Sequence, residues 1–291
     1  MRDWKIIEVP FESGSDRRGS GLAPRWLVEQ CFDATEHVEL EVENNAENEV
    51  GQCGIKNFDS VLDMSARLRD EVAAWRENGE KVLVIGGDHA IALGSVAGVL
   101  ECNPNVGVIW FDAHGDVNTE ATSPSMNAHG MPVAALLGQC ESRLNDIAWT
   151  RLKKENIFWV GARDLDKGEV ATIERLGIMD HVYSTERVHA MGMEAVMEDI
   201  KRKMEAQGVK ALHLSFDIDG MDPSIVWATG TRVEKGLTQE DLVAFIAGMQ
   251  GLPEMKSMDF VEYNPLLDDE DRTTGRWCVE TLRKLIVHNE K

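Results

Sequence analysis

Short apolar runs alternate along the chain with longer stretches in which apolar residues recur at helical spacing. The clearest helical patterns cover residues 60–80 and 193–209, where apolar positions recur every three or four residues. Because the short runs are apolar on both faces, the alternation predicts a mainly parallel sheet covered by helices on both sides. The six predicted strands are residues 5–10, 81–87, 106–112, 157–164, 211–219 and 257–265.

No feature of the sequence divides the chain into separate units. Its 291 residues contain no Pro/Ser-rich linker, internal repeat or low-complexity tract. Hydrophobic residues make up 43% of the chain, which is ample for a substantial core. We therefore expect one α/β domain over residues 1–291, a three-layer αβα unit with a mainly parallel central sheet.

The charge of the chain is strongly negative. Acidic residues outnumber basic ones by 51 to 30, and the formal net charge is -21. Because there is also no Lys/Arg-rich run, neither nucleic acid nor an anionic membrane is expected as a partner. Six of the acids fall within residues 36–50, which we interpret as a solvated surface segment.

The cysteines and the N-terminus indicate a cytoplasmic protein. The five cysteines are odd in number, widely spaced and never in CxxC form, a pattern typical of reduced intracellular thiols. The first residues, MRDWKIIEVPFESG, carry charges where a signal peptide needs an apolar core. No window approaches the roughly 18 apolar residues of a membrane span.

Acidic and histidine residues follow four of the predicted strands. In parallel sheets, ligands collect beyond the carboxyl ends of the strands, where successive loops meet. In the stretch VIWFDAHGDVN, Asp112, His114 and Asp116 occupy every second position and would point to one face of an extended backbone. The other three strand ends are followed by Asp88 and His89, by Asp217, Asp219 and Asp222, and by Glu262.

The combination of these residues points to a metal site. Alone, an Asp-x-Asp at a strand end is usually a turn or a helix cap, and a single His89 after two glycines is more often structural. Together, at least four clustered carboxylates would raise one another's pKa values, and two divalent cations would balance their charge. A set of mostly oxygen ligands with two imidazoles suits Mn²⁺ or a similar ion better than structural Zn²⁺.

A site for two such ions indicates a hydrolase. Metals roughly 3.5 to 4 Å apart can share a bridging water and lower its pKa enough to supply hydroxide near neutral pH. These motifs alone do not identify the electrophile that is attacked, since binuclear phosphoesterases also use Asp-x-His elements. Those enzymes usually add an Asn-His element, and the dipeptide NH occurs nowhere in this chain.

Three separated motifs resemble those of the ureohydrolase (arginase/agmatinase) family, in the family's order and with comparable spacing. They are GGDHA at 86–90, DAHGDVN at 112–118 and SFDIDGMDPS at 215–224. In addition, DRRGSGLAP at 16–24 resembles the family's N-terminal loop, and FVEYNP at 260–265 resembles its last active-site strand. The resemblance implies an arginase-like fold, a single ureohydrolase-like catalytic domain, and two metal sites formed by His89, Asp112, His114, Asp116, Asp217 and Asp219.

The loop NTEATSPSMNAHG, residues 118–130, resembles the arginase version of the family. By this resemblance Asn118, Ser125 and Asn127 hold the α-carboxylate of an amino-acid substrate, and His129 serves as proton shuttle. Small polar side chains can hydrogen-bond a carboxylate without placing a full charge beside it.

Other positions that the resemblance implies would hold the rest of the substrate. The segment RDLDKGE, residues 163–169, resembles the arginase segment whose acids receive the α-amino group, which assigns Asp166 and Glu169. Thr231 joins the substrate-binding positions, and Glu262 faces the planar guanidinium.

The implied activity is that of arginase, on a small guanidino substrate. A hydroxide bridging two Mn²⁺ ions attacks the guanidinium carbon of L-arginine and yields L-ornithine and urea, and Asp116 helps to orient that hydroxide. Other divalent ions such as Co²⁺ fit the same ligands, and the resemblance also implies a homo-oligomer, either a trimer or a hexamer.

Other interpretations stay open. The nearest is another guanidino hydrolase of the same family, namely an agmatinase, a guanidino-acid hydrolase or a formimidoylglutamase. A catalytically silent family member would generally lose metal ligands, whereas all six positions are filled here. A deacetylase on the related fold would usually hold a single metal ion.

One position departs from the family's pattern. After ATGT the family usually continues with a proline and a glycine-rich turn, but this chain has Arg232 where that proline would restrict the backbone. The loop borders the pocket in the enzymes that the chain resembles, so its conformation bears on the choice of substrate.

Overall fold

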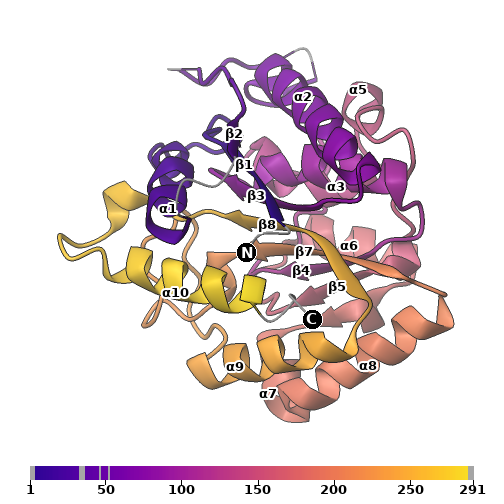
Figure 1. The fold of residues 1–291 in the computed structure, drawn as a ribbon. Helices are drawn as coiled ribbons and strands as arrows, with labels where there is room; N and C mark the ends of the chain where they lie inside the picture. Colours follow the sequence, from indigo (N-terminus) through magenta and orange to yellow (C-terminus); the bar gives the residue numbers. More distant parts are fainter. Residues whose placement is uncertain (1–3, 33–36, 46, 52, 288–291) are drawn as a thin grey trace.

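One sheet of eight parallel strands runs through the chain. The computed structural model describes residues 4–32, 37–45, 47–51 and 53–287. The strand order is β2-β1-β3-β8-β7-β4-β5-β6, and all neighbouring strands pair in parallel (Figure 1). The strands are β1 Trp4–Val9, β2 His37–Glu39, β3 Lys81–Gly86, β4 Gly107–Phe111, β5 Ile157–Val160, β6 Val182–Tyr183, β7 Ala211–Asp217 and β8 Glu254–Val261.

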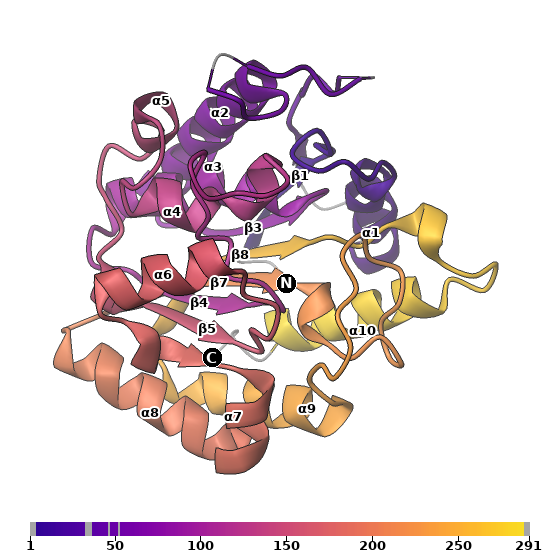
Figure 2. The same cartoon turned by 180° about the vertical axis from the view of Figure 1, so that it is seen from behind.

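Helices cover both faces of the sheet and form two separate cores (Figure 2). On one face, apolar side chains of α2 Phe58–Glu77, α3 Ala92–Cys102, α4 Pro132–Leu136, α5 Ser142–Asn145 and α6 Lys167–Leu176 pack on the strands. On the other face pack α1 Ala23–Cys31, α7 Thr185–Met191, α8 Met193–Ala206, α9 Gln239–Gly248 and α10 Thr273–Val287. The predicted three-layer αβα arrangement with a parallel sheet is therefore confirmed.

The central strands are the ones that the sequence pattern identifies most directly. Every residue of β4, β5 and β7 is buried, because both faces of these strands are covered by helices. The six predicted runs correspond to β1, β3, β4, β5, β7 and β8. Each run extends beyond its strand at the carboxyl end, because the following residues turn away to form loops.

The sequence pattern does not predict two of the strands, and both of them lie at the edges of the sheet. β2 has three residues and β6 has two, which is too short for a pattern of apolar positions. β2 falls within the acidic segment that we expected to be a solvated surface segment. Most described residues of 37–50 are exposed, but Leu40 is buried and the charged edge strand pairs with β1. Residues 36 and 46 lie outside the described residues.

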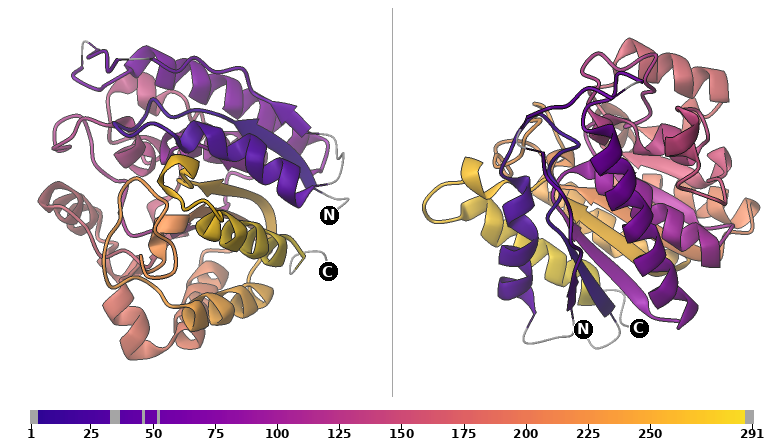
Figure 3. Two further views of the ribbon diagram at one scale, coloured as in Figure 1. Left: turned by 90° about the vertical axis from the view of Figure 1, so that its left-hand side faces the viewer. Right: turned by 90° about the horizontal axis from the view of Figure 1, so that it is seen from above.

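A helix near each end of the described chain packs on the same face of the sheet. Helices α1 and α10 lie side by side (Figure 3). The Arg283 guanidinium in α10 donates a hydrogen bond to the carbonyl of Gln30 in α1, at 2.6 Å. None of the helices in the described ranges has the length and apolar character that crossing a membrane requires.

The four strands that precede the predicted metal ligands and Glu262 are neighbours in the centre of the sheet. They are β3, β8, β7 and β4, in this spatial order. Because parallel strands end on the same side, the loops after them meet at one edge. The topology therefore brings together motifs that are separated by up to about 170 residues in the sequence, such as His89 and Glu262.

The loop after β3 is held against the N-terminal loop by close backbone contacts. The amide of Gly87 donates to the carbonyl of Val9, and the amide of Asp88 donates to the carbonyl of Phe11. A Cβ at Gly87 would lie 2.0 Å from the carbonyl oxygen of Phe11. Only glycine therefore fits between the two segments that frame the start of the site.

We expect Gly87→Ala to lower the free energy of unfolding by roughly 1 to 3 kcal/mol, the usual cost of forcing extra atoms into a packed interior. Gly251→Ala is the control, because a Cβ there would meet only the flexible side chain of Lys201, at 3.6 Å or more. Urea unfolding of both variants measures the difference. Equal stability of the two variants would contradict the close packing at Gly87.

Candidate active site

The six residues predicted as metal ligands converge beyond the carboxyl ends of β3, β4 and β7. His89 begins the short helix after β3, Asp112 directly follows β4, and Asp217 ends β7. The ligand atoms of His89, Asp112 and Asp217 all lie within 4.8 Å of one another. A second group with the same property consists of Asp112, His114 and Asp219. Asp112 belongs to both groups and therefore joins two potential ion sites.

The imidazole of His89 faces the carboxylates in a way that suits a shared cation. Its Nδ1 lies 2.9 Å from Asp112, 3.1 Å from Asp116 and 3.2 Å from Asp217. This buried nitrogen nevertheless makes no well-formed hydrogen bond to any described residue. Buried polar atoms are normally hydrogen-bonded, so a nitrogen directed between three carboxylates fits a metal ligand.

The second group has a similar geometry around His114. Its Nδ1 lies 3.2 Å from Oδ1 of Asp112 and 3.2 Å from Oδ2 of Asp219. Asp112 thus directs Oδ2 toward His89 and Oδ1 toward His114. A carboxylate that presents one oxygen to each group is suited to bridge two ions.

Burial makes this concentration of carboxylates unfavourable without cations. Burial, together with the neighbouring Asp219 and Asp112, raises the pKa of Asp217 well above its usual range. Burial and the charge of Asp112 raise the pKa of Asp116 to about 6. Divalent cations would stabilise the ionised forms of all these groups, and the donor set of carboxylates and two imidazoles fits Mn²⁺ or a similar ion.

The backbone at Asp116 adopts a conformation that is unusual for a residue with a side chain. Its φ is 50°, in the left-handed region. Glu262, which directly follows β8, also lies in this region, with a φ of 67°. Positive φ values at two residues around one site indicate that the surrounding structure imposes these conformations, as is common at functional sites.

A small polar cavity of about 230 Å³ opens over the candidate metal ligands. Drug-sized ligands usually occupy roughly 300 to 1,000 Å³, so this cavity suits a smaller molecule. Four lining residues were not identified from the sequence: Ser123, Pro124, Gly130 and Asp164. The predicted site residues that line it are His89, His114, Asp116, Asn118, Ser125, His129, Asp166, Glu169, Asp217 and Thr231.

Asn118 and Asp166 form one wall of the cavity. The Asn118 side-chain amide donates to Asp166 at 2.7 Å, and its carbonyl oxygen accepts from Thr122 at 2.8 Å. These bonds orient the amide and leave Asn118 one further N–H for a ligand. Ser125, on the same loop, is exposed, and its Oγ accepts from the amide of Asn127.

Asn127 itself is not among the residues that line the cavity. It is buried, and its side-chain oxygen accepts a hydrogen bond from the Lys56 ammonium at 2.9 Å. Lys56 also forms an ion pair with Asp16 at 2.8 Å, and its amide donates to the carbonyl of Met126. Asn127 and Lys56 therefore support the loop that carries Ser125. The sequence does not indicate this role of Lys56, because the partners of its side chain depend on tertiary packing.

Asp166 and Glu169 form the start of α6 as well as part of the cavity. Asp166 accepts hydrogen bonds from the amides of Gly168 and Glu169, and Glu169 accepts one from the amide of Asp166, which is a capping box. Burial and the charge of Asp116 raise the pKa of Glu169 to about 7. Glu169 is buried and Asp166 is partly exposed, so Asp166 is the more accessible of the two acids.

His129 and Glu262 form a hydrogen-bonded pair. Burial alone would lower the pKa of His129, but the hydrogen bond from its Nδ1 to Glu262 at 3.2 Å and the charge of Glu262 raise that pKa to about 9. Glu262 also accepts from the backbone amide of His89, at 2.9 Å. Glu262 is buried and does not line the cavity, so in this structure it faces His129.

The guanidinium of Arg163 helps to hold the loop after Thr231. Thr231 donates to Asp219 at 2.9 Å, while Arg232 is exposed and makes no hydrogen bond or ion pair to the residues that the structure describes. Arg163, which sequence reasoning did not single out, connects this loop to the loop that bears Asp219. Its guanidinium donates to the backbone carbonyls of Gly161, Asp219, Gly220, Met221, Val233 and Glu234.

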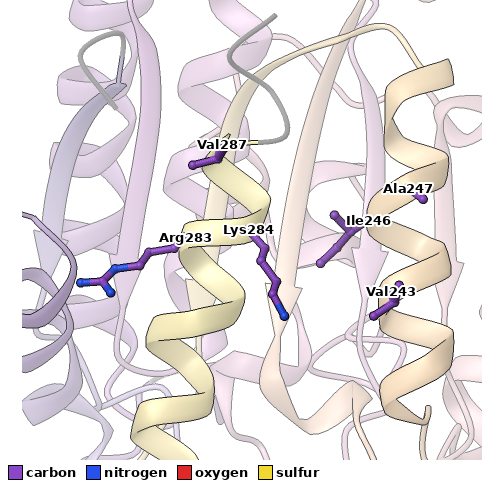
Figure 4. A pocket seen from close by; sticks show the side chains of 6 residues that line it. All are labelled: Val243, Ile246, Ala247, Arg283, Lys284 and Val287. Carbon is purple, nitrogen blue, oxygen red and sulfur yellow. The ribbon is translucent and has the colours of Figure 1, made fainter.

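A larger hollow of about 560 Å³ lies away from this site, between α9 and α10. Figure 4 shows the side chains that line it: Val243, Ile246, Ala247, Arg283, Lys284 and Val287. No acid or histidine is among these six residues, so they offer no carboxylate or imidazole to a metal ion.

Comparisons with known proteins agree on one family. Residues 2–288 match the model of the arginase family. An arginase of Entamoeba histolytica is 38% identical over 289 residues, which are 96% of each chain.

Solved structures agree with this match. The Entamoeba histolytica arginase in complex with L-ornithine superposes with a TM-score of 0.87 at 34% identity, covering 97% of this chain and 98% of that one. The Bacillus caldovelox arginase superposes with a TM-score of 0.89 at 35% identity, covering 100% and 99%. The chain therefore belongs to the arginase family and is a metal-dependent hydrolase of a linear amidine C–N bond.

Proposed function

We propose that the enzyme hydrolyses L-arginine to L-ornithine and urea. The observation that carries this proposal is the pairing of groups around one small cavity. Candidate metal ligands form its floor, while Asn118 and Asp166, in direct contact at 2.7 Å, form its wall. Neutral N–H donors beside a partly exposed carboxylate match the two charged ends of an α-amino acid. The related Entamoeba histolytica arginase was crystallised with L-ornithine, which has the same two groups.

The two ions would be held by the residues of the two ligand groups. His89, Asp112 and Asp217, with Asp116 close to His89, would hold one ion, and Asp112, His114 and Asp219 the other. When bound, two divalent ions lower the pKa of water held at the site and stabilise developing negative charge. Mn²⁺ is the ion that we propose, with Co²⁺ as an alternative for the same ligands. Asp116 would orient the attacking water.

His129 is positioned to act as a proton donor. Its Nδ1 is bound to Glu262, so Nε2 is the ring nitrogen available to a substrate. With a pKa of about 9 the imidazole is protonated at neutral pH. It can then protonate the departing amine, which would otherwise leave as an unstable anion. Glu262 supports His129 in this role and supplies negative charge close to the cationic guanidinium.

Selection of arginine over related guanidino compounds would come from the rim of the cavity. Asn118 and Ser125 would bind the α-carboxylate, with Asn127 supporting their loop. Asp166, beside Glu169, would receive the α-ammonium group. Agmatine lacks the carboxylate, and a simple guanidino acid lacks the amine, so each would lose one of the two sets of contacts. Thr231 would contact the substrate from the opposite loop.

We further infer that the enzyme works in the cytoplasm as a homo-oligomer, a trimer or a hexamer. All five cysteines are free, which is compatible with a reducing compartment. Size-exclusion chromatography with light scattering would measure the size of the oligomer.

We expect two divalent ions per chain in the fully active enzyme, because clustered buried carboxylates need cations. Elemental analysis would give the stoichiometry. Removal of the ions by a chelator should abolish release of urea, and added Mn²⁺ should restore it, with Co²⁺, Mg²⁺ and Zn²⁺ as comparisons. Full activity with one ion per chain would contradict the two-ion site.

We expect His129→Asn to lower the turnover number by about 10² to 10⁴, the range for a general acid, while both ions stay bound. Asn keeps a polar side chain but cannot transfer a proton. His189→Asn is the control, because His189 is exposed and pairs with Asp241. Loss of an ion in His129→Asn would instead place His129 among the metal ligands.

We expect Asp166→Asn to weaken arginine binding by roughly 1.5 to 3 kcal/mol, the range for a hydrogen bond to a charged group. Asn is also a good N-cap, so the start of α6 should be preserved, which Asp166→Ala would not ensure. Steady-state kinetics would compare arginine with the guanidino acid that lacks the α-amine. If both substrates lose equally, Asp166 does not recognise the amine.

A further inference from the structure

A group of polar side chains lies inside the sheet, behind the candidate metal ligands. β7 contributes His213 and Ser215, and β8 contributes Ser257 and Asp259. In the register of the two strands, His213 pairs with Ser257 and Ser215 pairs with Asp259. All four side chains are at most 1% exposed. None of them has a role in the function proposed above.

Asp259 is the centre of this group. Its Oδ2 accepts hydrogen bonds from Ser95 at 2.7 Å, from His213 at 3.1 Å and from Ser215 at 3.3 Å. The other oxygen, Oδ1, has no hydrogen-bond partner among the residues that the structure describes. His213 is in turn fixed by Ser257, whose Oγ lies 2.7 Å from Nδ1.

Ser215 connects Asp259 to the candidate metal ligand His89. Its Oγ lies 2.8 Å from Nε2 of His89. Asp259 can only accept when ionised, so the Ser215 hydroxyl donates to it and uses a lone pair to accept from His89. His89 must then carry its proton on Nε2. The opposite nitrogen, Nδ1, keeps its lone pair and faces Asp112, Asp116 and Asp217, as metal binding requires.

A buried carboxylate in the middle of a sheet is costly, and its partners do not fully satisfy it. Apolar residues could fill the same space without that desolvation cost. The presence of Asp259 therefore calls for an effect that apolar residues cannot supply. A negative charge two hydrogen bonds from Nε2 of His89 makes the opposite nitrogen, Nδ1, a stronger ligand, and the chain of bonds fixes the plane of the ring.

We propose that Ser215 and Asp259 are positioning residues that hold His89 in the tautomer and orientation needed to bind one of the two ions. Ser95 and His213 also donate hydrogen bonds to Asp259, but they lie outside the path from Asp259 to His89. This inference rests on the two-ion site of the proposed function. It also makes the two histidines of that site different from each other. His114, the imidazole of the second group, is partly exposed, and the carboxylate on its Nε2 side, Asp164, is largely exposed and 4.0 Å away.

The decisive experiment compares Ser215→Thr with Ser215→Val. The two replacement side chains have nearly the same shape and differ only in the hydroxyl, so any packing strain is common to both. Calorimetric titration of the metal-free full-length variants with Mn²⁺ gives the affinity of each ion without an activity assay. We expect Ser215→Val to bind one ion 10 to 100 times more weakly than Ser215→Thr, the usual effect of losing such a partner, with the second ion unchanged.

Asp259→Asn and Ser95→Ala extend the test beyond Ser215. Asp259→Asn removes the charge and should also weaken one ion selectively. Ser95→Ala removes an equally buried hydrogen bond to the same oxygen but leaves the path to His89 intact, so its two affinities should stay near those of the parent. Urea unfolding of the metal-free proteins should show the same stability for Ser215→Thr and Ser215→Val.

Three results would overturn the proposal. The first is equal Mn²⁺ affinities for Ser215→Thr and Ser215→Val. The second is an equal loss of both ions in Ser215→Val, and the third is a loss in Ser95→Ala as large as in Asp259→Asn. The parent protein is titrated first, and a parent that binds fewer than two ions would overturn the proposed function instead, so the two failures are distinguishable.

Discussion

Buried negative charge at the ends of the central strands is the constraint on which the site depends. Backbone amides satisfy part of it: Asp112 accepts from the amide of His114, Asp217 from that of Asp219, and Asp219 from that of Ala113. Asp112 and Asp217 are thus fixed by their own loops, and Asp219 by the loop after β4, before any cation binds. The oxygens that remain face the two histidines, so the loops direct the residual charge to two adjacent points.

Two positively charged side chains hold the loops around the site: Arg163 binds backbone carbonyls, and Lys56 binds side-chain oxygens. Arg163 donates to carbonyls of the loops on both sides of the metal ligands, and Lys56 holds the loop that carries Ser125. Burial lowers the pKa of Arg163, and the nearby carboxylates of Asp219 and Asp112 oppose this shift. A guanidinium that binds carbonyls can connect two loops without neutralising the carboxylates that the ions need.

The sequence predicts the centre of this protein better than its edges. The strands β3, β4, β7 and β8 and the acids that follow them are visible because each is a local pattern of apolar residues followed by ligands. The edge strands β2 and β6 depend on a neighbour for their pairing, and Lys56 and Arg163 have long side chains whose partners are set by packing. Ser215 and Asp259 are visible as polar positions within apolar runs, but only the strand register shows that they pair.

Charge also explains why neutral side chains suit the end of the substrate that carries the α-carboxylate. The chain carries a net charge of -21, and such a field favours the approach of a cationic guanidinium compound. The same field disfavours an anion, so the α-carboxylate needs local donors. A lysine or arginine within the cavity would pair with the carboxylates on its floor and compete with the ions. The amide of Asn118 and the hydroxyl of Ser125 offer hydrogen bonds without that competition, and the exposed Arg232 lies where solvent screens its charge.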